Sequence, residues 1–567
     1  MEKGIDYPEW FTEGGLNTIS KGYLLKGENV FDAYQRVAHA AAINLEKPEL
    51  EQYFYEALIK NWLCPASPVL SNLGTTRALP ISCFGIDIGD SIYKIASGSL
   101  ELMMLTKSGG GVGIGLSRIR GRGSLIKNNG HSEGVIPWSK RYDTDILSTN
   151  QGSVRRGAAS VNLNVEHDDV DEFLRIRRAQ GDVNRQCLNL NHCIQITDGF
   201  MERMLSGGKK EQELWINILK TRFETGEPYL HFIDTTNRNK PEAYKNNNLD
   251  VSMTNICSEI TLYTDEDHSF VCCLSSLNLT RFEEWEKYKF DNGMTLPELG
   301  IWFLDGVLQD FINRGQHIQG LEKAVRSAEK GRALGLGVLG WHTFLQRKEL
   351  PFIGFQSMKW TNRIFKFIKS EAEKASRDLA IEYGEPEWCQ GTGKRNSHLL
   401  ALAPTVSNSV ISGGVSASIE PIRANCYNLK GAKGVSIVKN QELENLLKQY
   451  GHNTKKVWQS ILENRGSVQH LTMLTEEQKE VFLTFPEISQ LEIVRQAAAR
   501  QKYLDQAQSI NLCFPENVDP KYFHRVHVDA WKLGLNTLYY CRALNHVRGD
   551  MASRQYKEAD MCKSCEG

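Results

Sequence analysis

The pentapeptide Asn255-Ile256-Cys257-Ser258-Glu259 combines three side chains that could act together in catalysis. In an extended chain successive side chains point to opposite sides, so Asn255, Cys257 and Glu259 would share one side. An amide can hold a sugar hydroxyl, a thiol can host a reactive sulfur, and a carboxylate can remove a proton. The competing interpretation is a surface strand with one buried cysteine, and the five residues alone favour it.

Other cysteines strengthen the catalytic hypothesis through their arrangement. Cys272 lies in a second strand-like run, 15 residues after Cys257, so a hairpin could bring these thiols close, and Cys83 lies in a third apolar run. The chain ends in a Cys562-Lys563-Ser564-Cys565 dithiol, which could recharge a reductant pair by thiol–disulfide exchange. Because no second CxxC accompanies it, we expect no four-cysteine zinc site. Each cysteine taken alone indicates core packing.

Three segments could bind phosphate groups. Residues 107–113 are glycine-rich but lack Walker spacing, so an ordinary turn is the better interpretation. Residues 404–409 offer hydroxyl and N–H donors at the expected start of a helix, where a phosphate site and an ordinary capped helix start are equally supported. Residues 151–157 form a basic loop or a solvated linker. The adjacent Tyr539 and Tyr540 are either redox-active phenols or one core ring and one half-exposed ring.

The composition restricts the class of protein. The chain has 567 residues, of which 41% are hydrophobic and 24% charged, and its formal net charge is −1. This balance disfavours a protein that coats nucleic acid, because phosphate neutralisation needs a basic surplus. No apolar run approaches the roughly 18 residues of a membrane-spanning helix, and the N-terminus lacks the apolar core of a signal peptide. We therefore expect a cytoplasmic protein with reduced cysteines and no membrane or nucleic-acid partner.

The elements that must position these residues alternate between helical and strand-like patterns. Apolar residues at three- and four-residue steps predict helices at 30–45, 48–62, 91–107, 198–206, 211–223, 297–314, 318–346, 356–384, 475–503 and 520–533. Short alternating or apolar runs predict strands at 158–163, 193–196, 269–274, 398–402 and 535–541. This alternation indicates an α/β fold. From Arg542 onward there is little apolar surface to bury, which predicts a mobile tail.

Taken together, these motifs resemble the large (catalytic, alpha) subunit of class I ribonucleotide reductase. The resemblance extends from about residue 15 to the C-terminus, with the motifs in the family's order. Asn255, Cys257 and Glu259 match its Asn-x-Cys-x-Glu finger loop. The remaining matches are the active-site redox pair Cys83 and Cys272, the tail dithiol Cys562 and Cys565, and the tandem tyrosines Tyr539 and Tyr540 that pass a radical from a small subunit.

The resemblance also implies nucleotide-binding positions. Substrate contacts are implied for Ser67, Ser82, Gly110, Gly111, Thr405, Val406, Ser407 and Asn408. A deoxynucleotide effector site is implied for Asp90, Ser91, Ile92, Arg120, Gln151 and Arg155. Residues 151–157 match the loop that relays effector identity to base choice, and of the two arginines at 155 and 156, Arg155 aligns without a gap.

The fold of the family is a ten-stranded α/β barrel. Two parallel five-stranded halves run antiparallel to each other, and the finger loop lies inside. We expect an N-terminal helical region at 1–75, the barrel at 76–541 and a flexible redox-active tail at 542–567. Many members begin with a helical ATP-binding cone, but residues 31–42 already resemble the first core helices. We therefore expect no such cone here, and no dATP inhibition through it.

The resemblance implies a thiyl-radical mechanism on ribonucleoside diphosphates. A radical from a metal-containing small subunit would pass through Tyr540 and Tyr539 to Cys257, whose thiyl takes the 3′ hydrogen while Glu259 removes the 3′-hydroxyl proton. The redox pair is re-reduced by the tail, which a thioredoxin- or glutaredoxin-like protein recharges. We expect no metal or cofactor on this chain itself, dNTP or ATP with magnesium as allosteric effectors, and a homodimer built on the helix at 91–107.

Two other functions remain open on the sequence. An adenosylcobalamin-dependent class II reductase would form the same thiyl without a small subunit, and the tandem tyrosines favour class I. A non-catalytic nucleotide-binding paralogue would have no reason to keep the finger-loop residues, the redox pair and the tail dithiol together.

Overall fold

The N-terminal part of the chain is helical. The computed structural model describes residues 7–107, 109–149, 157–178, 181–431 and 434–544. The first helices are α1 (Glu13–Ile19), α2 (Val30–Asn44), α3 (Glu51–Ile59) and α4 (Ser67–Asn72). Helix α2 begins where Asn29 and Asp32 form a reciprocal capping box. It packs against α13 (Leu296–Gly315), where a Cβ at Gly306 would lie only 2.4 Å from the Ala41 carbonyl oxygen, so this crossing requires glycine.

Five consecutive parallel strands form the first half of a barrel. They are β2 (Cys83–Asp87), β3 (Gly111–Gly115), β4 (Ala158–Asn164), β5 (Leu190–Ile196) and β6 (Tyr229–Phe232), hydrogen-bonded in that order. Parallel neighbours need long crossover connections. These crossovers carry α5 (Ile92–Lys107), α6 (Ile136–Thr149), α7 (Val170–Phe173), α8 (Asp198–Leu205) and α9 (Lys209–Thr225).

The second half repeats this arrangement with less regular strands. β7 (Phe270–Asn278) pairs in parallel with β8 (Leu334–Leu339), and isolated parallel bridges join Leu336 to Leu400 and Leu402 to Gln508. The segment after Gln508 continues into β11 (Leu512–Pro515), which lies parallel to β13 (Cys541–Leu544), directly after β12 (Thr537–Leu538). The strand predicted at 398–402 is thus present as single bridges rather than as a regular strand.

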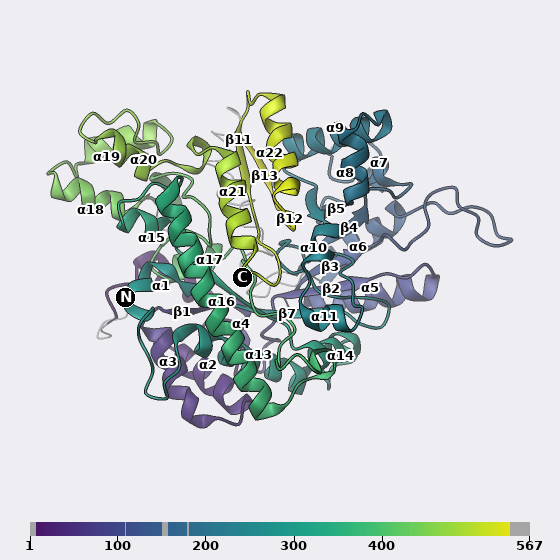
Figure 1. Ribbon diagram of the computed structural model, residues 1–567, viewed down its shortest axis with the longest axis horizontal. Coiled ribbons are helices and arrows are strands. Elements are labelled where there is room, and N and C mark those ends of the chain that lie inside the picture. Colours follow the sequence, from purple (N-terminus) through teal and green to yellow (C-terminus); the bar gives the residue numbers. More distant parts are fainter. Residues whose placement is uncertain (1–6, 108, 150–156, 179–180, 432–433, 545–567) are drawn as a thin grey trace.

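Two antiparallel contacts close the ring. β2 pairs with β7 at one junction, and β6 pairs with β12 at the other. The halves β2–β6 and β7, β8, 400–402, 508–515 and 537–544 therefore form a closed barrel of two five-membered parallel halves, as predicted. Long helices cover its outside, among them α13, α14 (Glu322–Gly331), α15 (Trp341–Arg347), α16 (Phe355–Tyr383), α21 (Gln490–Gln501) and α22 (Pro520–Lys532) (Figure 1).

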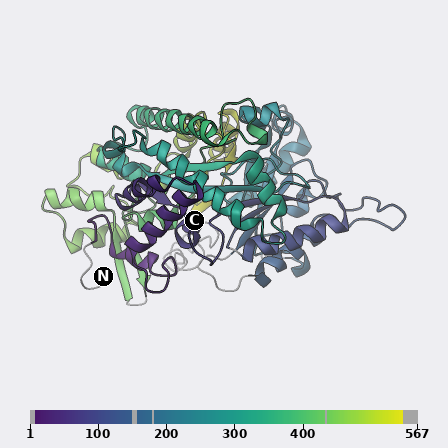
Figure 2. The same cartoon turned by 90° about the horizontal axis from the view of Figure 1, so that it is seen from below.

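A small unit with its own apolar core follows the barrel segment at 400–402. It consists of the hairpin β9 (Cys426–Gly431) and β10 (Gly434–Lys439) and the helices α18 (Gln441–Gln449), α19 (Lys455–Glu463) and α20 (Glu476–Val481). Figure 1 shows its helices at the opposite side of the molecule from α8 and α9. In both views the N-terminal helices and α5 also lie on opposite halves of the long axis (Figure 2).

Two helix predictions are wrong in the same way. The helix predicted at 318–346 is α14, β8 and α15, because Arg332 takes a left-handed φ of 42° and ends α14, and the next residues form a barrel strand. The helix predicted at 475–503 is α20 and α21 with a short 3₁₀ turn, Phe485–Glu487, between them. The remaining elements are β1 (Leu63–Pro65), α10 (Ile233–Arg238), α11 (Glu242–Asn246), α12 (Phe282–Trp285), α17 (Val406–Ile411) and 3₁₀ turns at Pro48–Leu50, Val183–Arg185, Leu279–Arg281 and Glu387–Cys389. Across the described ranges, no helix is both long and apolar enough to cross a bilayer.

Candidate active site

The loop that joins β6 to β7 passes through the inside of the barrel. On one side, the Asn162 amide of β4 donates to the Thr254 carbonyl at 3.3 Å, and Gly113 of β3 leaves no room for a Cβ, which would lie 2.1 Å from the same oxygen. On the other side, Ala507 N donates to the Glu259 carbonyl at 2.9 Å. Because both halves of the barrel contact it, this loop occupies the finger-loop position that the resemblance implied.

The tip of the finger loop is a turn, which corrects the extended conformation assumed for residues 255–259. Ser258 has a left-handed φ of 65°. The turn still gathers two of the three predicted side chains, because Asn255 Nδ2 donates to Glu259 Oε2 at 2.9 Å and Ile260 N donates to Asn255 Oδ1 at 3.1 Å. Asn255, Cys257 and Glu259 are all buried.

The redox pair is brought together by strand pairing. Cys83 of β2 and Cys272 of β7 occupy directly opposite positions in the antiparallel register. Such pairs have Cβ atoms roughly 4.5–5.5 Å apart, close to the separation that a disulfide spans. Both are free, buried cysteines. The expected hairpin between Cys257 and Cys272 does not form, since the strand that pairs with this end of β7 is β2.

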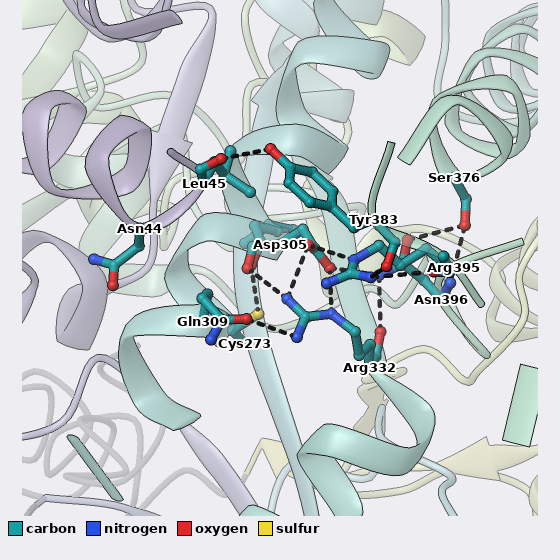
Figure 3. Close-up of polar contacts among 12 residues, drawn as sticks. Asn44, Leu45, Cys273, Asp305, Gln309, Arg332, Ser376, Tyr383, Arg395 and Asn396 are labelled. Carbon is teal, nitrogen blue, oxygen red and sulfur yellow. Dashed lines mark hydrogen bonds and ion pairs between the residues drawn. The ribbon is translucent and has the colours of Figure 1, made fainter. Parts of the chain in front are cut away.

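The neighbouring Cys273 faces away from this pair, because successive strand residues point to opposite faces. Its Sγ contacts the Leu304 carbonyl of α13 at 3.4 Å, beside a buried ionic network centred on Asp305 (Figure 3). Asp305 accepts hydrogen bonds from Arg332 at 2.8 and 2.9 Å and from Arg395 at 3.1 Å. Of the two adjacent cysteines, Cys272 is therefore the one placed opposite Cys83, and Cys273 packs behind the barrel wall.

Cys83 is also the point where the redox pair meets the finger loop. The Asn255 amide donates to Cys83 Sγ at 3.2 Å, and the Cys83 thiol donates to Glu259 Oε1 at 3.7 Å. Burial raises the pKa of Glu259, and hydrogen bonds from Asn255, Ser509 and Cys83 oppose this rise. Burial likewise raises the pKa of Cys272. The site thus holds a carboxylate of increased basicity beside two cysteines, of which Cys272 has a raised thiol pKa.

The tandem tyrosines adopt the arrangement of one buried and one half-exposed ring. Tyr539 is buried and belongs to the same apolar cluster as Cys257, whereas Tyr540 is only partly buried. The two ring centroids are 4.4 Å apart. Two further members of this cluster were not predicted: Tyr229, whose ring lies 4.6 Å from Tyr539, and Asn191, whose amide donates to the Tyr540 hydroxyl at 2.8 Å.

The predicted substrate positions fall at the starts of four elements, β2, β3, α4 and α17. Ser82 directly precedes Cys83, and its carbonyl accepts from Gly111 N at 2.8 Å. Thr405 is the N-cap residue of α17 but makes no side-chain capping hydrogen bond, and Asn408 in that helix donates to the Pro65 carbonyl at 2.9 Å. Of the other predicted substrate residues, Ser67 is buried at the start of α4 and Gly110 directly precedes β3. Val406 is exposed and Ser407 is partly exposed.

Two of these substrate positions have unpaired polar atoms. Ser82 Oγ and Asn408 Oδ1 are buried and have no hydrogen-bond partner among the residues that the structure describes. A buried polar atom without a partner is costly, so such atoms suit a ligand that supplies the missing hydrogen bonds.

Four of the six predicted effector residues lie in the described part of the chain, and they cluster at the start of α5. Arg120 Nε donates to Asp90 Oδ2 at 2.7 Å, Ser91 Oγ accepts from Lys94 N at 3.2 Å, and Ile92 begins the helix with an exposed side chain. Gln151 and Arg155 of the effector loop, and Cys562 and Cys565 of the tail, lie outside the described residues.

Sequence reasoning missed the segment 505–511, Asp-Gln-Ala-Gln-Ser-Ile-Asn. Gln506 Nε2 donates to Cys272 Sγ at 3.6 Å, Ser509 Oγ contacts Glu259 Oε2 at 3.3 Å, and Tyr540 N donates to Asn511 Oδ1 at 3.2 Å. The cluster of amide and hydroxyl side chains between a helix and an apolar strand could have indicated that this segment belongs to the site. Polar residues between two such elements are also typical of an ordinary loop.

Family models match nearly the whole chain. The model described as "Ribonucleotide reductase, barrel domain" matches residues 81–211, 209–392 and 387–541, and "Ribonucleotide reductase, all-alpha domain" matches residues 9–78. The chain belongs to the ribonucleotide reductase family. Family membership and the barrel confirm both the resemblance and the predicted fold.

Individual relatives in the family agree with this assignment. The chain is 33% identical to the ribonucleoside-diphosphate reductase large subunit of Invertebrate iridescent virus 3, covering 98% of each chain. It is 27% identical to the large subunit of Danio rerio, covering 97% of this chain and 78% of that one. Among solved structures, the class Id ribonucleotide reductase alpha subunit of Actinobacillus ureae is 39% identical, with a TM-score of 0.87 over 96% of this chain and 99% of that one.

Proposed function

We propose that the chain is the catalytic subunit of a ribonucleoside-diphosphate reductase that makes 2′-deoxyribonucleotides through a thiyl radical on Cys257. The observation that carries this proposal is the meeting of three groups at Cys83: its partner thiol Cys272 lies opposite on β7, and Asn255 and Glu259 contact it from the finger loop. Each group has a different task in removing one hydroxyl from a ribose. Relatives named as ribonucleoside-diphosphate reductase large subunits support the same substrate class.

The reaction balances with these side chains. The Cys257 thiyl takes the hydrogen from C3′, and Glu259 takes the proton of the 3′-hydroxyl, which Asn255 orients. The 2′-hydroxyl then leaves as water after protonation by the thiol pair. Cys83 and Cys272 supply two electrons and become a disulfide, and Cys257 returns its hydrogen to C3′. The sum is one ribonucleotide and one dithiol converted to one deoxyribonucleotide, one disulfide and water.

The radical would enter from a small subunit through Tyr540 and then Tyr539. Support comes from the burial order: Tyr540 is partly exposed, Tyr539 is buried, and Tyr539 shares an apolar cluster with Cys257. The relative from Actinobacillus ureae is named as an alpha subunit, and others are named as large subunits. The metal that generates the radical would then belong to the small subunit rather than to this chain.

The proposed regeneration uses the C-terminal dithiol, and the proposed control uses residues near the start of α5. The Cys562–Cys565 dithiol would reduce the Cys83–Cys272 disulfide, and a thioredoxin- or glutaredoxin-like protein would recharge that dithiol. A dNTP or ATP with magnesium would bind beside the Asp90–Arg120 pair. A homodimer would form over α5, where Ile92, Tyr93 and Leu100 leave large apolar side chains exposed.

Reduction of CDP tests the proposal. The chain should form dCDP with thioredoxin only when a class I small subunit is added, and Cys257→Ala with the same small subunit is the matched control. Turnover with adenosylcobalamin and no small subunit would assign class II instead. Nucleotide binding without reduction under either condition would mean that the chain is a non-catalytic paralogue.

A further inference from the structure

The segment 505–511 lies beside the finger loop and is joined to the barrel wall by an isolated parallel bridge between Gln508 and Leu402. Gln506 N donates to the Leu400 carbonyl at 3.2 Å and Ser509 N to the Leu402 carbonyl at 2.9 Å, so the segment is fixed to the barrel wall. From that wall, Ala507 N reaches inward to the Glu259 carbonyl at 2.9 Å. The segment therefore connects the finger loop to the barrel wall through backbone hydrogen bonds.

Ser509 is the residue of this segment whose side chain contacts both Cys257 and Glu259. Its Oγ lies 2.7 Å from the Cys257 carbonyl oxygen and 3.3 Å from Glu259 Oε2. The side chain is buried. Both of these oxygens are acceptors, so the single Ser509 proton is shared between them, with the shorter contact to the Cys257 carbonyl. Ser509 therefore links the backbone of the radical-bearing cysteine to the carboxylate of the base.

The two carboxylate oxygens of Glu259 have different hydrogen-bond partners. Asn255 Nδ2, at 2.9 Å, and Ser509 Oγ, at 3.3 Å, both converge on Oε2. Oε1 faces only the Cys83 thiol, at 3.7 Å, among the hydrogen bonds described for it. Oε1 is thus the oxygen that can accept a proton from a substrate hydroxyl, and it lies beside the thiol that serves the next step.

We propose that Ser509 is a positioning residue that holds Glu259 against the Cys257 turn and so presents Oε1 to the 3′-hydroxyl. This inference rests on the proposed function, because it concerns the base of that reaction. The Ser509 hydroxyl contacts the Cys257 carbonyl and the Glu259 carboxylate, so it acts through Glu259. Because its hydrogen bond favours the ionised carboxylate, the proposal also predicts how the pH dependence of the enzyme changes.

Replacement of Ser509 by alanine should lower kcat for CDP by about tenfold and leave KM nearly unchanged, as expected for a lost hydrogen bond to a charged group. With the donor removed, the pKa of Glu259 rises further, so the acid limb of the pH–rate profile should move up by about one unit. Ser509→Thr, which keeps the hydroxyl, should restore both values. Ser139→Ala is the matched control, because Ser139 of α6 is also buried but, among the described residues, its Oγ donates to the Val135 carbonyl just before that helix.

A double-mutant cycle separates positioning from packing. In a Glu259→Gln background, Ser509→Ala should lower kcat only slightly further, because the carboxylate through which Ser509 acts is already removed. Two results would overturn the proposal and leave Ser509 a packing residue. One is that Ser509→Ala lowers kcat equally at every pH, and the other is that it lowers kcat by the same factor with Glu259 and with Gln at position 259. If Ser509→Ala lowers the unfolding temperature or effector binding, Ser509→Cys, which is close in volume and a weak donor, replaces it and should show the same shift of the acid limb. Failure of the unsubstituted chain to reduce CDP would instead refute the proposed function.

Discussion

Gly113 of β3 is the position where the smallest substitution should disturb the site most. A Cβ there would lie 2.1 Å from the Thr254 carbonyl oxygen and 3.1 Å from Asn255 Cα, both backbone atoms of the finger loop. Protein Cβ atoms essentially never come within 3.0 Å of another heavy atom, so the loop must move by at least about 0.9 Å. A misplacement near 1 Å at a reacting group costs roughly 100-fold in rate.

We therefore expect Gly113→Ala to lower kcat by roughly 100-fold, with an overpacking cost of about 1–3 kcal/mol in the free energy of unfolding. The assay is steady-state CDP reduction, with chemical denaturation as the measure of stability. Gly115→Ala is the control on the same strand, because its Cβ would meet the side chains of Asp87 and Met253, which can move more easily than backbone. Unchanged kcat in Gly113→Ala, or equal losses in both variants, would refute the placement of the loop against β3.

Three further predictions concern the radical, the tail and the effector site. Cys257→Ser should abolish turnover while nucleotide binding survives, because a hydroxyl does not readily form the radical; deoxynucleotide formation by this variant would disprove the thiyl assignment. With pre-reduced enzyme, Cys562→Ser/Cys565→Ser should make roughly one product per site and then stall under thioredoxin, whereas a small dithiol should restore turnover; sustained activity with thioredoxin would exclude the tail relay. We expect dATP to act as a specificity effector beside Arg120; a titration that rises and then falls to zero, with a second nucleotide bound, would contradict this.

The composition of the finger loop could be predicted from the sequence, but its conformation could not. Residue types at 255, 257 and 259 indicated an amide, a thiol and a carboxylate acting together, and the structure places the amide and the carboxylate in contact. The extended geometry assumed for them was wrong, since Ser258 takes a left-handed φ of 65°. A turn also brings positions 255 and 259 together, so the expected contact arises from a different local structure.

The helix predicted at 318–346 illustrates the limit of periodicity. Its apolar spacing suits a helix throughout, yet Leu334–Leu339 form a barrel strand buried on both faces. A short apolar run has no period that distinguishes a buried strand from a buried helix. Packing against a distant segment selects the strand. At Gly337 a Cβ would lie 2.6 Å from the Ala401 carbonyl oxygen, so the requirement for glycine comes from a segment more than 60 positions away.

The sequence by itself determined the chemistry available to this protein, because motif residues carry their reactivity with them wherever the chain places them. Only the tertiary structure decided which of those groups meet. Closure of the barrel sets β2 antiparallel to β7, and that register alone puts Cys272 opposite Cys83 and turns Cys273 toward Asp305. The same closure brings Ser509 to Glu259 across 250 residues. Contacts between distant strands depend on register and twist, which local patterns of residue type do not encode.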